Sequence, residues 1–264
     1  RGLGDVYKRQ VKRVVEPIIL LNHDWSIDEN SSLETSIGYQ FGEMGNSRLD
    51  YAGGGNPSPA YYQDLPSYFL ADTNGPDYEG AYIAQENFVN DGQINWNRIY
   101  DANLTNNLSN LNAAYVLYED RVDDTQLTIN SAYNREINEN IKITSSVNYR
   151  NLVSDNFAEI SDMLGGYSYS NIDSFDNLDY NLLSPNSIVS DGDKFKYHYK
   201  MNAEEISLFS MINFSYNKLE FYLAGDLTNT TYQRDGIFEN EANAGNSSGK
   251  VKKLSLMGTG LKLV

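Results

Sequence analysis

Apolar and polar residues alternate along several segments of the chain, which is the pattern of a strand with one covered and one wet face. The clearest example is residues 33–41. One face of this segment carries Leu33, Thr35, Ile37, Tyr39 and Phe41, and the other carries Glu34, Ser36, Gly38 and Gln40. Because successive side chains of a strand point to opposite faces, the alternation predicts a β-strand here.

The strand signals come in three pairs, and a short polar turn joins the two members of each pair. The predicted pairs are 17–27 with 33–41, 125–136 with 141–152, and 206–216 with 219–232. A further strand is predicted from about residue 252. Long segments rich in Asn, Asp, Gly, Ser and Tyr connect the pairs, at 42–124, 151–205 and 233–250. Short turns on one side and long loops on the other are typical of bacterial outer-membrane barrels.

The strand lengths and the aromatic residues fit the same interpretation. A tilted strand of about ten residues crosses an apolar band of about 25 Å. Aromatic side chains are expected at both borders of such a band. Near the short turns lie Trp25, Tyr133, Tyr216 and Phe221, and toward the long loops lie Tyr39, Phe41 and Tyr149. We therefore predict an all-β fold, an antiparallel up-and-down transmembrane barrel segment with about seven strands of a larger barrel. A β-sandwich also alternates, but short turns at both ends would be usual there.

The first long loop contains two segments that read as helices. Residues 77–90 and 95–106 each begin with a residue of the capping type, Asp77 and Asn95. Before them lies GGGNPSPAYYQDLPSYFL, residues 53–70, in which glycines and prolines predict an ordered, turn-rich path. We expect the long loops to be extracellular and to contain these short helices.

Composition narrows the class of protein. The chain has 264 residues, its mean hydropathy is −0.54, and apolar runs such as residues 17–21 are far shorter than the stretch of about 20 apolar residues that a membrane helix needs. A membrane barrel needs no such apolar run, because only alternate residues of each strand face lipid. The net charge of −16 disfavours nucleic acid as a partner. The absence of cysteine removes disulfides, thiolate metal sites and cysteine nucleophiles.

The candidates for chemistry are few. His23 and His198 are the only histidines, and a hydrolase would need a serine and an acidic partner whose position the sequence does not identify. Asp191, Asp193 and the stretch 72–77 suggest a calcium site, but the EF-hand order is not met and Pro76 stands where a ligand should be.

Two pairs of neighbouring carboxylates are also candidates. Glu204 with Glu205 and Asp123 with Asp124 are adjacent in the sequence, so in strands they would point to opposite faces, which disfavours joint acid–base chemistry. We therefore assign no catalytic, metal or cofactor-binding residue, and we do not expect an enzyme. The sequence leaves the substrate-binding residues unknown.

Four segments share a family pattern: residues 53–70, INWNRIYDAN at 94–103, the hairpin YEDRVDDTQLTINSAYNREINENIKITSSVNY at 118–149, and GDKFKYHYKM at 192–201. Together they resemble TonB-dependent outer-membrane receptors of the Bacteroidetes type. These are loop and hairpin patterns with no catalytic signature. The resemblance covers about residues 11–264. It implies a longer protein with a signal peptide, an N-terminal plug inside a 22-stranded barrel, and a short box that engages an inner-membrane energising complex.

The expected organisation follows from this resemblance. Residues 1–10, RGLGDVYKRQ, resemble a translated sequencing-adapter scar, and we exclude them from the fold. Residues 11–264 would form a partial barrel domain, incomplete at both ends and without the plug. The expected function is energised uptake of a scarce nutrient, a metal chelate, glycan or peptide, across the bacterial outer membrane. The expected partners are outer-membrane lipid, an extracellular ligand and the energising complex. An adhesion or interaction barrel, or an outer-membrane hydrolase, remains the alternative.

Overall fold

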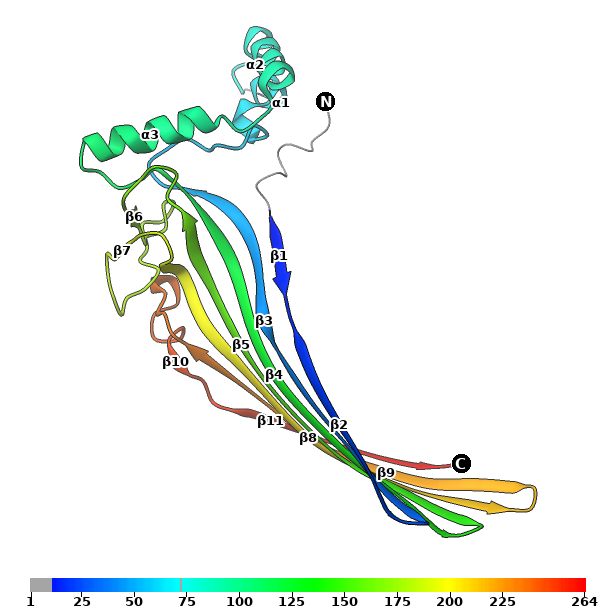
Figure 1. The fold of residues 1–264 in the computed structure, drawn as a ribbon. Helices are drawn as coiled ribbons and strands as arrows, with labels where there is room; N and C mark the ends of the chain where they lie inside the picture. Colours follow the sequence, from blue (N-terminus) through cyan, green and yellow to red (C-terminus); the bar gives the residue numbers. More distant parts are fainter. Residues whose placement is uncertain (1–10, 72) are drawn as a thin grey trace.

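The computed structural model describes residues 11–71 and 73–264, so the predictions about residues 1–10 and Asp72 lie outside the described residues. Long strands form one curved sheet, and the helices and irregular loops gather at one of its ends, named the loop end (Figure 1). The tight hairpin turns lie at the other end, named the turn end.

The strands are mostly long. In chain order they are β1 (Lys12–Val15), β2 (Ile18–Asp28), β3 (Ser31–Tyr51), β4 (Tyr115–Asn138), β5 (Ile141–Asp162), β6 (Tyr169–Ser170), β7 (Ile188–Val189), β8 (Lys194–Tyr216), β9 (Leu219–Gly236), β10 (Gly249–Lys250) and β11 (Leu254–Leu263). The helical elements are η2 (Tyr62–Asp64), α1 (Pro66–Leu70), α2 (Tyr78–Asp91), α3 (Trp96–Leu108) and η3 (Glu241–Asn243). The predicted helices at 77–90 and 95–106 are confirmed as α2 and α3.

The main sheet is an antiparallel meander. β1 and β2 both pair with β3, followed by β4, β5, β8 and β9, and both β10 and β11 pair with β9. Strands account for 56% of the described residues and helices for 15%, which confirms the antiparallel all-β prediction. Of the nine strands that the described part of the chain places in this sheet, seven are long, as predicted. The described sheet is open, with β2 and β11 at its edges, so closure into a barrel stays a prediction.

The turn end is built from two-residue turns, and the side chains of residues in or next to these turns favour their formation. The Asp28 carboxylate accepts a hydrogen bond from the Asn30 backbone N–H at 2.8 Å, and the Asn138 side chain accepts one from the Asn140 N–H at 2.9 Å. In the third turn Asn217 has a φ of +53°, a conformation that asparagine tolerates better than most residues. The turns, together with one-residue bulges at Ile27 and Ile137 beside the first two, fix the register of each hairpin.

The register places the apolar residues of neighbouring strands side by side. Leu21, Ile37, Ile129, Tyr149 and Ile206 form one row across five strands. The surface made of this row and the parallel rows from Trp25, Leu33 and Tyr133 up to Phe41 and Val153 is called the apolar face. The opposite surface, the polar face, carries Asn22, Ser36, Asn130, Asn148 and Ser207 at the same level. The predicted division of the residues between the faces is confirmed.

The apolar face is open to its surroundings in the described part of the chain. Leu21 is 62% exposed, Val147 45% and Ile206 47%, although these side chains stand in the middle of paired strands. A water-soluble sheet normally buries such a face against a second layer. Among the described residues, no helix combines the length and the apolar character needed to cross a bilayer.

The predicted strand ends at the loop side were wrong. β3 continues to Tyr51, β4 begins at Tyr115, β5 ends at Asp162 and β8 begins at Lys194, about ten residues beyond the predicted limits. The reason is that alternation stops while backbone pairing continues. Tyr39, Phe41 and Tyr149 therefore lie in mid-strand, and the loops are shorter than predicted.

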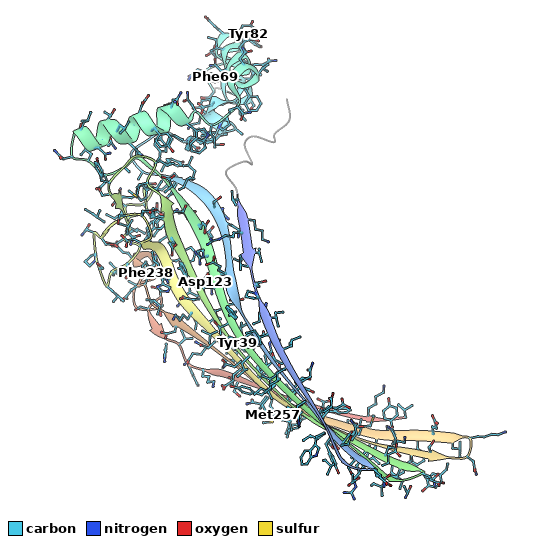
Figure 2. The ribbon with its side chains drawn as sticks, viewed as in Figure 1. Tyr39, Phe69, Tyr82, Asp123, Phe238 and Met257 are labelled. Atoms are coloured by element: carbon cyan, nitrogen blue, oxygen red, sulfur yellow. The ribbon has the colours of Figure 1, made fainter. Side chains whose placement is uncertain are left out.

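A charged row marks the point where alternation stops. Immediately beyond Phe41 and Val153, one row carries Glu43, Asp123, Asp155 and Lys200 on the same surface as the apolar face. Figure 2 shows Asp123 closer to the loop end than Tyr39 and Met257. Like charges on adjacent strands are unfavourable, and Arg121 offsets them through contacts with Glu43 and Asp123. The same surface thus changes from apolar to charged within two residues of each strand.

The buried core lies at the loop end. There Val116, Ala158 and Phe195 have 0% exposure and pack with Tyr118 and Ile160, on the side of the sheet that is polar farther down. A second cluster joins Ile99 of α3 to Ala114, Tyr115 and Leu164. Burial of apolar surface therefore stabilises the loops and the strand ends next to them.

Asn103 holds these loops together. It is 0% exposed, and its Nδ2 donates to the carbonyl oxygens of Tyr115 at 2.8 Å and of Met163 and Leu164 at 3.1 Å each. Its Oδ1 accepts from the N–H groups of Ala114 at 2.8 Å and Tyr115 at 3.1 Å. One side chain thus provides hydrogen-bond partners for backbone groups of two separate segments, 114–115 and 163–164, that strand pairing leaves unsatisfied. Buried backbone groups need such partners.

Replacing Asn103 by alanine should open this junction. A buried backbone group left unpaired costs about 1–3 kcal/mol, so a loss of about 2 kcal/mol should speed amide exchange of Ala114 and Tyr115 about thirtyfold. Hydrogen–deuterium exchange read by mass spectrometry measures this change. Asn107→Ala is the matched control, because Asn107 is only half-buried on the same helix and donates a single bond, to the Gly165 carbonyl. Equal exchange rates in both variants would contradict the assignment.

Candidate functional site

The loop between β3 and β4, residues 52–114, folds into a helical unit above the sheet. Pro66 occupies the first turn of α1, where its missing N–H costs nothing. Asp77 caps α2 by accepting from the Gly80 N–H at 2.8 Å, and Asn95 caps α3 by accepting from the Arg98 N–H at 3.0 Å. These caps fix where each helix begins, and hence how the two helix ends face each other.

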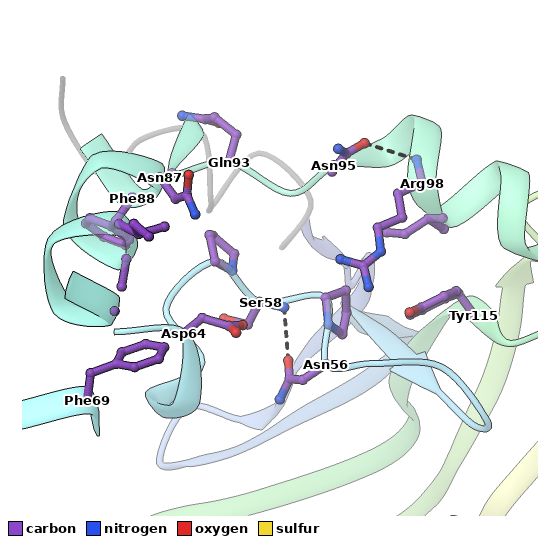
Figure 3. A pocket seen from close by; sticks show the side chains of 17 residues that line it. Asn56, Ser58, Asp64, Phe69, Asn87, Phe88, Gln93, Asn95, Arg98 and Tyr115 are labelled. Carbon is purple, nitrogen blue, oxygen red and sulfur yellow. Dashed lines mark hydrogen bonds between the residues drawn. The ribbon is translucent and has the colours of Figure 1, made fainter. Parts of the chain in front are cut away.

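A cavity of about 500 Å³ lies between these elements (Figure 3). Its volume is in the range of sites that hold small molecules, about 300–1,000 Å³. The apolar members include Phe69, Ile83, Phe88, Ile99 and Tyr115, and the polar members include Asn56, Asp64, Asn87, Gln93, Asn95 and Arg98.

Tyr115, the first residue of β4, forms the wall next to the sheet. It is 4% exposed and its hydroxyl donates to the Gly55 carbonyl at 2.7 Å. A Cβ on Gly54 would lie 2.6 Å from that hydroxyl oxygen, so the glycine is needed for the close approach. The glycine-rich start of the loop is thereby folded against the strand, and the cavity is anchored to the sheet.

Two charged groups reach into the cavity without a partner among the described residues. Arg98 forms neither an ion pair nor a side-chain hydrogen bond with any residue that the structure describes, and the same holds for the Asp64 carboxylate. Figure 3 shows Arg98 extending from α3 and Asp64 from the side of η2 into the same hollow. Arg98 is the only Lys or Arg in residues 52–114, a segment with seven Asp and Glu residues. An unpaired cation in such an acidic segment is a candidate ligand contact.

The segment between β5 and β8 and the start of β8 are tied to β3 and β4 by tyrosine hydroxyls, a lysine and carboxylates. Tyr169 donates to Asp50 at 3.1 Å, Tyr197 donates to Asp120 at 2.8 Å, and the Lys196 ammonium lies 2.9 Å from Asp50. Burial, reinforced by the nearby Asp50, raises the pKa of the Tyr169 hydroxyl, and burial likewise raises the pKa of Tyr197. Both hydroxyls therefore stay protonated and act as donors, which is a structural role.

The two histidines lie far apart in the fold and have different surroundings. His198 is packed against Phe157 and Phe238, and its Nε2 lies 2.8 Å from Asp155 Oδ1 and 3.3 Å from the Lys194 ammonium. His23 stands opposite Thr35 on the apolar face near the turn end. The structure does not bring the two together, and the contacts of His198 are those of a packed side chain that links β5 to β8.

The acidic candidates have structural contacts. Asp193 accepts from the Ser190 N–H and hydroxyl, both at 2.9 Å, and Asp77 caps α2. In the described part of the chain no group of three or more His, Cys, Asp and Glu residues has a metal-binding arrangement.

The adjacent carboxylates separate between the two faces, as predicted for neighbours in a strand. Glu204 contacts Lys253 at 2.9 Å, whereas the Glu205 carboxylate accepts from Thr230 at 3.3 Å. Asp123 pairs with Arg121, and Asp124 stands in the neighbouring position of β4.

Sequence reasoning missed the cavity residues. Asn103 carries no signal of its own, because its five backbone partners come from distant segments. Arg98 could have been noticed, since it is the single cation of its loop. Comparisons of the sequence with models of known protein families and with characterised proteins give no match.

His198 provides a pH-dependent test of the packing at the loop end. Burial lowers its pKa, and Lys194 and Lys200 lower it further against the opposing effect of Asp155. The unfolded chain then takes up a proton before the folded chain does, so stability should fall as the pH drops below the ordinary histidine value of about 6.5.

Nuclear magnetic resonance titration of the imidazole checks this expectation directly, with the signal assigned by its loss in His198→Gln. The midpoint should lie below about 6.5. The thermal midpoint of the wild-type chain should also fall more steeply between about pH 7.5 and about pH 5 than that of His198→Gln. A titration midpoint at or above the ordinary value would contradict the described packing.

Proposed function

We propose that this chain is a wall segment of an outer-membrane β-barrel receptor that takes up a scarce nutrient. The observation that carries the proposal is the exposed apolar face, which lies in register across long antiparallel strands with two-residue turns at one end. A lipid-facing barrel wall has this combination of an apolar outside and a polar inside. The polar face would then line the lumen.

The height of the apolar face fits a membrane. From Ile141 to Val153, β5 would rise about 30 Å at about 3.3 Å per residue and a tilt of about 45°, close to the apolar band of such barrels, about 25 Å. The charged row with Glu43, Asp123 and Asp155 would mark the outer border. Beyond it, the strands would continue outside the membrane and raise the loop cavity above the surface.

Transport and energy coupling rest on the resemblance of residues 53–70, 94–103, 118–149 and 192–201 to TonB-dependent receptors. A ligand releases into the lumen only if it binds two states of the receptor differently. In that family a plug domain and a coupling box provide the second state. The upstream coding sequence is a direct test, because a plug and a coupling box would support transport, whereas a passenger domain or a catalytic domain would contradict it.

Arginine substitutions on the apolar face should block membrane assembly. Ile37→Arg and Leu223→Arg each place a charge toward lipid. The cost is about 2–4 kcal/mol near the midplane, where Ile37 lies, and smaller at Leu223, whose row with Ile212 and Ile143 lies close to the turn end. Folding into lipid vesicles, followed by heat-modifiable mobility on gels and by protease protection, measures the loss of assembled protein.

Matched controls exist on the neighbouring residues of the same strands. Ser36→Arg and Ala224→Arg introduce the same side chain on the polar face, where water would solvate it. These variants should assemble at nearly the wild-type yield. Normal assembly of Ile37→Arg and Leu223→Arg would refute the lipid-facing orientation.

The chain without lipid should self-associate in water. Its edge strands β2 and β11 present unpaired backbone groups, and the apolar face adds exposed side chains beside them. Analytical ultracentrifugation in buffer and in detergent micelles tests this expectation, with monodisperse protein expected only in micelles. A monomer that unfolds cooperatively in plain buffer would contradict the membrane proposal.

A second candidate function is adhesion or docking to another protein without transport. The observation in its favour is the aromatic surface of the helical unit, where Tyr78 is 74% and Tyr82 64% exposed. Such exposed rings are common in protein interfaces. Deletion of residues 62–91 discriminates the two functions, because it would abolish cell attachment in the second case and nutrient-dependent growth in the first.

A further inference from the structure

The loop cavity has opposite charges on different walls. The Arg98 guanidinium and the Asp64 carboxylate both line it, and neither has an ion-pair partner among the described residues. Oppositely charged groups that face the same space without contacting each other leave both charges available to a ligand. A ligand that carries one positive and one negative group would satisfy both.

Two helix ends add to this polarity. The C-cap residue of α2, Gly92, and the N-cap residue of α3, Asn95, both border the cavity. The end of a helix carries a partial negative charge and the start of a helix a partial positive charge. The start of α3 lies next to Arg98 in the sequence, so a ligand carboxylate is favoured on that side.

Amide side chains supply the remaining polar contacts. Asn87 and Gln93 form no side-chain hydrogen bond with other described residues, and Asn56 uses its Oδ1 for the Ser58 N–H at 2.9 Å, leaving its Nδ2. An amide side chain offers both a donor and an acceptor, which is what the N–H and C=O of a peptide bond require. Phe69, Ile83 and Phe88 provide an apolar surface beside these groups.

From this arrangement we propose that the cavity binds a short zwitterionic peptide of two or three residues with an aromatic or aliphatic side chain. The carboxylate contacts Arg98, the ammonium contacts Asp64, the peptide bond contacts the amide side chains, and the ligand side chain packs on Phe69 and Phe88. This inference deepens the proposed function. Uptake of the peptide after binding rests on that function, whereas the binding itself does not.

The other nutrient classes fit the cavity less well. A neutral glycan would leave a charged guanidinium and a carboxylate without a charged partner once water is displaced, which is costly. A multiply charged metal chelate would meet a single cation in a loop with seven acidic residues. The zwitterion is the class that matches one cation and one anion.

Isothermal titration calorimetry on the full chain in detergent micelles tests the proposal at neutral pH and low salt. The probes are alanyl-phenylalanine, its C-terminal amide and its N-acetyl form, with maltose and citrate as the neutral and trianionic comparisons. We expect the free dipeptide to bind at least about tenfold more tightly than either blocked form, because each block removes one charged contact.

Variants of the two charged residues test which group of the ligand each of them contacts. Arg98→Gln should weaken the free dipeptide about tenfold and leave the affinity for the amide unchanged, while Arg98→Lys retains part of the affinity. Asp64→Asn should act in the same way on the ammonium, with the N-acetyl form as its insensitive ligand. Asp101→Asn is the matched control, since Asp101 lies exposed on α3 and does not line this cavity.

Equal affinities for the free and blocked dipeptides, no binding of the free dipeptide, or tighter binding of maltose or citrate would each overturn the inference. The free and blocked dipeptides are compared on the wild-type chain, so this comparison tests the proposal even if a variant fails to fold. Failure here is distinguishable from failure of the proposed function, because the arginine substitutions on the apolar face test membrane assembly without any ligand.

Discussion

The register of the main sheet is the constraint on which the other features depend. Because side chains alternate with a period of two, a slip of one residue in any hairpin would move a strand's apolar residues to the opposite face. The turns at residues 29–30, 139–140 and 217–218 set these registers, the first two together with a one-residue bulge beside them, at Ile27 and Ile137. The pairs Leu21–Ile37 and Ile129–Tyr149 depend on the first two turns, and the third turn sets the pairs of β8 with β9, such as Leu208–Leu227. A continuous apolar face is thus a property of the turns as much as of the strands.

Much of this arrangement can be predicted from sequence, because its causes are local. Alternation at residues 33–41, turn-forming Asp and Asn residues, and helix caps at Asp77 and Asn95 each act within a few residues, and each prediction was confirmed. The ends of the strands at the loop side could not be predicted. There β3, β4 and β5 stay paired through charged and core-forming residues. The strands therefore extend beyond the alternation of apolar and polar residues that predicts them. Asn103 could not be found for a related reason, since its partners Ala114, Met163 and Leu164 come together only in the folded chain.

The same strands meet two different environments along their length. At the loop end, Val116, Ala158 and Phe195 are fully buried within the protein, as in a water-soluble domain. Toward the turn end the described residues offer no comparable burial for Leu21, Val147 or Ile206. One part of β4, β5 and β8 is therefore stabilised by the protein's own core, whereas no described residue covers the apolar face of the other part. In the proposed function, lipid covers that face. The charged row at Glu43 and Asp123 lies where these two requirements meet.

This division separates the loop cavity from the apolar face. The cavity with Arg98 and Asp64 belongs to a unit that is held by its own cluster around Ile99, by the caps of α2 and α3, and by Asn103. None of these contacts involves the apolar face. Changes in the cavity walls can therefore alter the ligand while the strands keep their register, which suits loops carried on a rigid scaffold. The connection between the two parts is the continuous backbone of β3 and of β4, which runs from Tyr115 in the cavity wall to the turns. In the proposed function, any effect of a bound ligand on the apolar face therefore passes through this stiff ladder or through the loop segments that Asn103 joins.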